Sequence, residues 1–203
     1  MATIGKHGIA ERTVVIFTSD NGGLDVSQGP NTPGTNNHPF RAGKGCLYEG
    51  GVREPLIIKW PGVVKSGRVS DAMVISNDFY PTICEMAGVP GRPNGRIDGL
   101  SLVPHLAKGK PIRRDTLYWH YPHYSGQGGR PSGSIRCGDW KLIEHFEDGK
   151  IELFELKADI SEKDDLAGKR PARANELHEK LIAWRKSVDA QMPTPNPEYK
   201  PPT

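Results

Sequence analysis

Two adjacent oxygen-bearing side chains, Asp20 and Asn21, come two residues after the apolar run Thr13–Thr18. In open α/β sheets, ligands bind beyond the carboxyl ends of the strands. Carboxylate and amide oxygens at such a position are ligands for a hard cation such as Ca²⁺ or Mg²⁺. Asn21-Gly22 is also a common turn dipeptide, so the spacing alone is compatible with either a metal site or a plain turn.

A second candidate is Lys44, which lies between Gly43 and Gly45. A lysine framed by glycines can reach an anionic group with little steric obstruction. The nucleotide-binding phosphate loop is excluded, because Gly45 stands at its Ser/Thr position and His38 at its first glycine. The alternative interpretation of Lys44 is a solvated loop lysine.

The third candidate is the segment Trp119–Tyr124, in which His120 and His123 alternate with aromatic residues. Such side chains can pack on a sugar or aryl ring and donate hydrogen bonds to it. The H-x-x-H spacing with an internal proline does not suit a zinc site on a helix. The other interpretation is a partly buried aromatic strand with ordinary histidines.

The first half of the chain predicts elements of an α/β protein. Thr13–Thr18 and Leu56–Trp60 are short apolar runs without alternation, typical of strands buried on both faces in a parallel sheet. A long loop is expected over 24–51. Helices are expected over Asp78–Gly88, where proline lies near the start and glycine at the end, and over Leu100–Leu106.

The second half predicts a small antiparallel sheet and one helix. Asp-Gly and Gly-Asp turns separate short strand-like runs, which indicates hairpins. The spacing of apolar residues over 172–190 predicts an amphipathic helix packed on that sheet. The expected strands are Thr116–His120, Gly133–Arg136, Trp140–Phe146 and Ile151–Leu156, and the apolar helix positions are Leu177, Leu181, Trp184 and Val188.

Composition excludes several classes of function. The chain has 203 residues and a formal net charge of +3, with no basic stripe, which argues against nucleic-acid binding. Apolar runs fall short of the ~18 residues of a membrane span, and no signal-peptide core is visible in this chain. The 3 cysteines lack C-x-x-C spacing, which excludes a disulfide framework and a cysteine-rich zinc site.

Seven segments in chain order resemble the sulfatase family of the alkaline-phosphatase-like superfamily. Each is individually unspecific, but their order is specific, and the tail Ala190–Pro197 resembles bacterial relatives of arylsulfatase A and N-acetylgalactosamine-6-sulfatase. The segments are Thr18–Gly23, Arg41–Gly45, Tyr48–Pro55, Asp78–Ile83, Asp98–Leu102, Arg136–Leu142 and Glu152–Leu156.

The resemblance implies roles for the candidate residues. Asp20 and Asn21 would be two of the Ca²⁺ ligands. Lys44 would be catalytic, contacting the sulfate ester and neutralising charge on the bridging oxygen as the S–O bond breaks. His120 and His123 would lie near the organic group of a sulfated small molecule or glycan.

The family's nucleophile is a formylglycine made from the first residue of C/S-x-P-x-R, and this chain contains no such motif. The early Asp-Asp metal pair is also missing. The chain therefore resembles the C-terminal portion of a sulfatase, with the end of the catalytic domain over 1–112 and a small α+β subdomain over 113–203. We expect it to be inactive alone, and its parent to be periplasmic or extracellular. Glu49 and Arg53 are expected to brace the loop.

The sequence is also compatible with two other functions. The chain could be a non-catalytic module that binds sulfated glycans, or part of a related phosphoesterase. An incomplete sheet exposes an edge and apolar faces, so a missing N-terminal half or self-association is expected to cover them. No membrane partner is expected.

Overall fold

The computed structural model describes residues 1–89 and 97–199 and divides into two compact units. The first unit comprises Met1–Asp20 and Pro55–Asp115, and the second comprises Asn21–Glu54 and Thr116–Thr203. The long loop that follows Asp20 thus belongs to the same unit as the C-terminal sheet.

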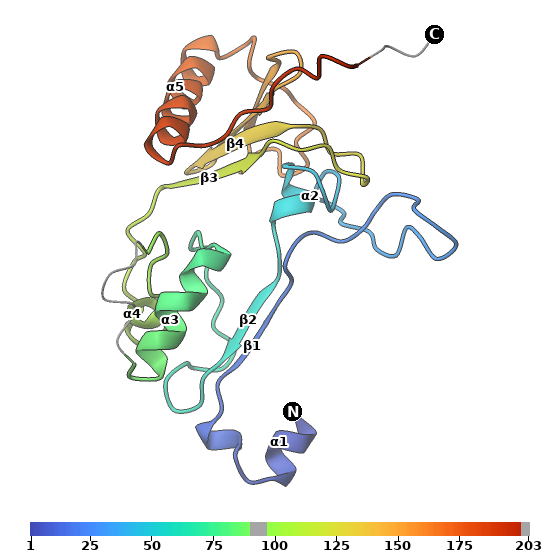
Figure 1. The fold of residues 1–203 in the computed structure, drawn as a ribbon. Helices are drawn as coiled ribbons and strands as arrows, with labels where there is room; N and C mark the ends of the chain where they lie inside the picture. The colour runs from blue at the N-terminus through green and yellow to red at the C-terminus, as the bar shows by residue number, and fades with distance from the viewer. Residues whose placement is uncertain (90–96, 200–203) are drawn as a thin grey trace. The chain divides into compact units, whose positions relative to one another are not determined.

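The first unit is built on a two-stranded antiparallel ladder of β1 and β2 (Figure 1). Around it lie short helices and 3₁₀ turns. The elements are α1 (Ala2–Lys6), a 3₁₀ turn (Ala10–Arg12), β1 (Val15–Thr18), β2 (Leu56–Lys59), a 3₁₀ turn (Ser76–Asp78), α3 (Phe79–Met86) and α4 (Val103–Lys108).

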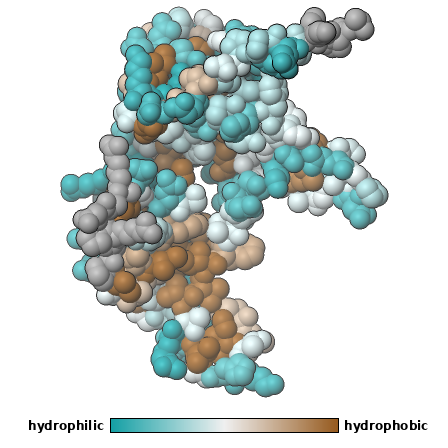
Figure 2. Space-filling view, in the orientation of Figure 1, coloured by the Kyte–Doolittle hydropathy of each residue, from teal (hydrophilic) through white to brown (hydrophobic). Residues whose placement is uncertain are grey.

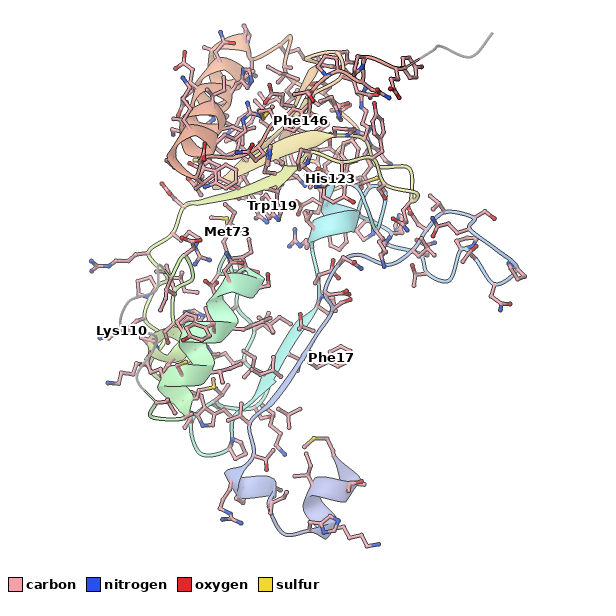
Figure 3. The ribbon with its side chains drawn as sticks, viewed as in Figure 1. Phe17, Met73, Lys110, Trp119, His123 and Phe146 are labelled. Carbon is pink, nitrogen blue, oxygen red and sulfur yellow. The ribbon has the colours of Figure 1, made fainter. Side chains whose placement is uncertain are left out.

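The expectation that β1 and β2 are strands of a parallel sheet, buried on both faces, is wrong for this chain, because the two strands pair antiparallel and are partly exposed. The cross-strand partners Phe17 and Ile57 are 60% and 63% exposed. Apolar side chains accordingly gather on the surface of this unit in Figure 2, and Phe17 points away from the ladder in Figure 3. The reason is that the described residues add no third strand to this ladder.

Asp78 is the polar anchor of the first unit. Its carboxylate is fully buried and forms a bidentate ion pair with Arg114, at 2.6 and 2.8 Å. The same carboxylate accepts the backbone N–H groups of Ile75 and Leu100, while Thr82 donates to the Asp78 carbonyl oxygen. These contacts hold the start of α3 to the chain on either side of it.

The second unit contains the antiparallel sheet and the helix that the sequence predicts. The sheet has the order β3-β4-β5-β6, and Gly138 and Gly149 take left-handed φ angles of 59° and 69° in its turns. Among the described residues, no helix is both long and apolar enough to span a bilayer. The elements are α2 (Glu49–Val52), β3 (Thr116–Tyr121), β4 (Ser132–Cys137), β5 (Trp140–His145), β6 (Ile151–Glu155) and α5 (Pro171–Ser187).

Helix α5 covers one face of this sheet. Its apolar face meets the sheet side chains at the predicted positions, and Trp184 stacks on Tyr118 with ring centroids 4.8 Å apart. Val188, expected on the same face, lies past the end of the helix and is exposed. The buried residues of this core are Ile135, Leu142, Leu153, Ala174, Leu177 and Leu181.

Truncating this core should destabilise the second unit. Leu177 is fully buried against the sheet, so we expect Leu177→Ala to lower the free energy of unfolding by about 2–5 kcal/mol. Urea denaturation followed by tryptophan fluorescence measures the change. Val188→Ala is the matched control, with an expected change within about 0.5 kcal/mol. Equal losses in both variants would contradict this packing.

Candidate functional site

Lys44 lies on a loop whose neighbouring glycines are required by close contacts. A Cβ atom on Gly43 would lie 2.3 Å from the Gly23 carbonyl oxygen and 2.6 Å from Asp25 Oδ1. Gly45 has a φ angle of 90°, which disfavours any other residue. The Lys44 N–H donates to the Gly23 carbonyl oxygen at 3.1 Å. The loop therefore presents Lys44 from a fixed backbone.

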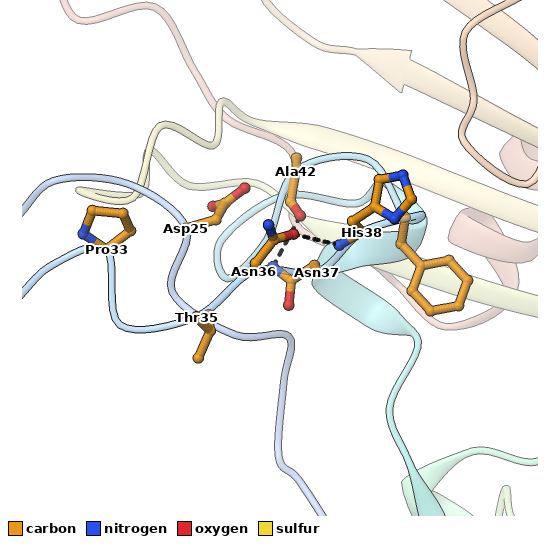
Figure 4. Close-up of a pocket in the computed structure, with 8 residues that line it drawn as sticks. Asp25, Pro33, Thr35, Asn36, Asn37, His38 and Ala42 are labelled. Carbon is orange, nitrogen blue, oxygen red and sulfur yellow. Dashed lines mark hydrogen bonds between the residues drawn. The ribbon is translucent and has the colours of Figure 1, made fainter.

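Asn37 supports this loop from within the preceding segment. Its amide nitrogen donates to the carbonyl oxygens of Gly23 and Ala42 at 2.9 and 3.1 Å, and its Oδ1 accepts the Gly23 N–H. A pocket of about 410 Å³ lies beside it (Figure 4). Its lining combines Thr35, Pro33 and Ala42 with the polar or aromatic side chains of Asp25, Asn36, Asn37, His38 and Phe40.

The Lys44 loop contacts the turn that follows His123. A Cβ atom on Gly45 would lie 2.1 Å from Ser125 Oγ, and one on Gly129 would lie 1.7 Å from the Gly45 carbonyl oxygen. His123 is exposed, two residues before Ser125, with its ring edge-on to Tyr121 at 5.6 Å. The structure therefore brings together the segments that carry Lys44 and His123.

His120 is placed differently. Its Nε2–H donates to the Gln191 carbonyl oxygen at 2.8 Å, and its ring packs on Phe146 at 5.5 Å. Strand alternation puts it on the same face of the sheet as Tyr118, the face that α5 covers. Its Nδ1 is buried and has no hydrogen-bond partner among the residues described. His120 and Lys44 are thus not brought together.

The boundary between the two units along the chain falls between Asp20 and Asn21. Asp20 is exposed, whereas Asn21 is half-buried and its amide donates to the Gly22 carbonyl oxygen at 3.1 Å. Within residues 1–89 and 97–199, no group of three or more His, Cys, Asp or Glu side chains could hold a metal ion. Ca²⁺ takes six to eight oxygen ligands. These two residues alone do not make a complete calcium site.

A fully buried ion cluster joins the Lys44 segment to the sheet, and the sequence did not predict it. Lys141, which lies within the expected strand Trp140–Phe146, is 0% exposed. Its Nζ donates to Glu49 Oε1 at 2.9 Å and lies 3.1 Å from Glu162 Oε1. Glu162 Oε2 accepts the backbone N–H of Glu49. The partners are far apart along the chain, so no local pattern reveals them.

The pKa values of the two carboxyl groups in this cluster are shifted in opposite directions. Burial is the largest influence on both and by itself raises their pKa values. At Glu49 the charges of Lys141, Arg136 and Arg53 together outweigh burial and hold the pKa below its usual value. At Glu162 burial prevails over Lys141, and the pKa is raised. Glu49, expected to brace the loop, therefore has Lys141 as a specific electrostatic partner.

A second network surrounds Glu152. The Nε2–H of His145 donates to Glu152 Oε2 at 2.8 Å, and the Tyr48 hydroxyl donates to the same oxygen. Arg130 Nε–H donates to His145 Nδ1, which fixes this tautomer. The hydrogen bond from His145, helped by those from Tyr48 and Lys150, lowers the pKa of Glu152 well below its ordinary value despite burial.

Comparison with known proteins identifies the family. Residues 40–187 match the family model described as N-sulphoglucosamine sulphohydrolase, C-terminal. The chain belongs to the sulfatases. A sulfatase of Formosa agariphila is 40% identical over 192 residues, which cover 87% of this chain and 34% of that protein. N-acetylgalactosamine-6-sulfatase of Mus musculus (41% over 119 residues) and arylsulfatase A of Homo sapiens (38% over 146 residues) are also similar.

Solved structures agree with the sulfatase assignment. The crystal structure of Ps i-CgsB in complex with k-i-k-neocarrahexaose superposes with a TM-score of 0.77 at 30% identity, covering 95% of this chain and 40% of that one. The chain spans 22% of the mouse relative and 27% of the human one, with 59% and 72% of this chain covered. The resemblance to a C-terminal portion of a sulfatase, with an alkaline-phosphatase-like α/β fold, is confirmed.

Removing the charge of Glu152 should destabilise the second unit in a pH-dependent way. Its pKa is lowered on folding, so its contribution is present above the ordinary value of 4.5 and is lost as the pH falls through the folded value. We expect Glu152→Gln to cost about 1–3 kcal/mol at pH 7, and less below about pH 4. Urea denaturation across this range measures it.

Glu179→Gln, on the exposed side of α5, is the control and should leave stability unchanged at every pH. A Glu152→Gln penalty that stays constant from pH 7 down to pH values well below 4 would show that the carboxylate charge is not the source of its contribution.

Proposed function

We propose that this chain supplies the substrate-side part of a sulfatase that hydrolyses sulfate monoesters of a carbohydrate. The observation that carries the proposal is the contact between the glycine-framed Lys44 loop and the turn after His123. The Lys44 ammonium is suited to the anionic ester, and the His123 imidazole is suited to the organic group that bears it. Membership of the sulfatase family supports the same activity.

In this proposal Lys44 acts on the leaving group. Its ammonium lies against the bridging oxygen and neutralises the charge that develops there as the S–O bond breaks. Gly43 and Gly45 let the loop pack closely against Gly23 and Ser125, which holds the backbone that carries Lys44 in place. The family's formylglycine nucleophile would come from a segment outside this chain. Asp20 and Asn21 would contribute two oxygens to a calcium site completed by other residues.

The pocket beside the Lys44 loop would receive the sugar. Asp25, Asn36 and His38 offer donors and acceptors for hydroxyl groups, and Phe40 offers an aromatic surface. A pocket of about 410 Å³ lies within the range of small-molecule sites. That the similar solved structure carries a neocarrahexaose supports a carbohydrate substrate. The parent would act in the periplasm or outside the cell, where such polymers occur.

The chain alone should not turn over substrate. We expect purified protein to release no 4-nitrophenol from 4-nitrophenyl sulfate, with or without Ca²⁺, because the chain contains no C/S-x-P-x-R motif for the nucleophile. The assay is absorbance at saturating substrate. Clear calcium-dependent release would contradict the proposal that the nucleophile is supplied elsewhere.

The role of Lys44 is tested in the whole protein. This means the present chain together with any coding sequence that lies in frame upstream of Met1. We expect Lys44→Ala to lower kcat/KM for a sulfate monoester by about 10²–10³, because it removes a preorganised charge from the leaving group. Lys65→Ala, an exposed loop lysine, is the matched control and should retain full activity.

The same assay separates the alternatives. Preference for phosphate over sulfate monoesters would indicate a related phosphoesterase. The absence of C/S-x-P-x-R from this chain favours a second candidate, a sulfated-glycan-binding module. A stop codon upstream, together with glycan-array binding that requires Lys44 and His123, would support that module and contradict the enzyme.

A further inference from the structure

The face of the second unit's sheet opposite α5 is covered by residues 41–53, the segment that carries Lys44. The Tyr48 ring packs edge-on against Phe154 of β6, with centroids 6.4 Å apart. The Arg41 guanidinium lies 3.8 Å from the centre of the Tyr48 ring. These contacts hold the segment against the sheet at strand β6, but they do not by themselves fix the backbone of the Lys44 loop.

Lys141 supplies the missing constraint. Its ammonium bridges Glu49, which begins α2 in this segment, and Glu162, which follows β6. Glu162 in turn accepts the backbone N–H of Glu49, so the first residue of α2 is held by both its side chain and its main chain. All three side chains are 2% exposed or less. Loss of the ammonium would leave two buried carboxyl groups facing each other.

We call Lys141, Glu49 and Glu162 the clamp. The backbone conformation at two residues near it supports a role for Lys141 in positioning the loop. Ala42 and Glu162 adopt left-handed φ angles of 56° and 52°, which cost free energy in residues other than glycine. Arg41 Nη1–H donates to the Glu162 carbonyl oxygen at 2.9 Å and so connects the two strained sites. Such conformations persist where the surroundings over-determine them. Ala42 lies two residues before Lys44.

We infer that Lys141 is a positioning residue for Lys44. By holding Glu49 and Glu162 together, it fixes the loop that carries the Lys44 ammonium in one position against the sheet. The inference rests on the proposed function of Lys44. Lys141 itself is enclosed by the two carboxylates and does not meet substrate.

Hydrogen exchange on the purified chain tests the clamp directly. In Lys141→Met we expect the amides of residues 41–53, including those of Lys44 and Gly50, to exchange at least about tenfold faster. Amides of α5 should keep their rates, because the core of α5 lies on the other face of the sheet. Unchanged rates over 41–53 would overturn the inference, as would equal acceleration throughout the second unit.

Two further variants make the result specific. Lys150→Met removes a lysine that pairs with Glu152 at the half-exposed start of β6, and should leave exchange over 41–53 unchanged. Glu162→Gln keeps the shape of the clamp but removes one charge. It should accelerate the same amides to a smaller extent, which keeps the inference testable if Lys141→Met does not fold.

Titration with sodium sulfate separates this inference from the proposed function. In the unaltered chain we expect saturable changes in the NMR shifts of the Lys44 and Gly45 amides, beyond those caused by sodium chloride of equal ionic strength. They should disappear in Lys141→Met and remain in Lys150→Met. If the unaltered chain gives none, the role of Lys44 is contradicted, while the exchange rates still decide whether Lys141 positions the loop.

Discussion

A lysine ammonium without contact to solvent requires opposite charge in fixed places, and this requirement organises the second unit. Lys141 sits on β5 at the face away from α5, where the strand alternation would otherwise call for an apolar side chain. Its two carboxylate partners come from segments 92 and 21 residues away along the chain. If either carboxylate moved away, the buried ammonium would lose an ion-pair partner. The irregular segment 41–53 therefore takes up one position on the regular sheet.

The neighbouring Glu152 carboxylate is stabilised by several hydrogen bonds and not by one buried ammonium. It is neutralised by hydrogen bonds from His145 and Tyr48 and by Lys150 at the surface, so its pKa falls. Glu162, with a single buried ammonium shared with Glu49, has a raised pKa instead. At Glu152 the hydrogen bonds outweigh burial and lower the pKa, whereas at Glu162 burial outweighs the shared Lys141 ammonium and raises it.

Local sequence patterns predicted what depends on neighbours in the chain. The Gly138 and Gly149 turns, the strand runs between them and the Leu177–Leu181 face of α5 were all visible, because turn chemistry and periodicity act over a few residues. Gly43-Lys44-Gly45 was recognised for the same reason. Contacts between distant segments were not visible. The pairing of Lys141 with Glu49 was missed, and so was the hydrogen bond of His120 to Gln191. The burial of β1 was overestimated because its apolar run says nothing about which strands this chain provides.

The discontinuity of the second unit has a consequence for the order of assembly. Residues 21–54 are separated from their sheet by Pro55–Asp115, which belong to the first unit. During synthesis from the N-terminus, the segment carrying Lys44 leaves the ribosome long before Lys141 and Glu162 exist to receive it. Closing so long a loop costs entropy that is recovered only when the sheet is present. The segment that carries Lys44 is thus synthesised early but takes its final position only when the sheet has formed.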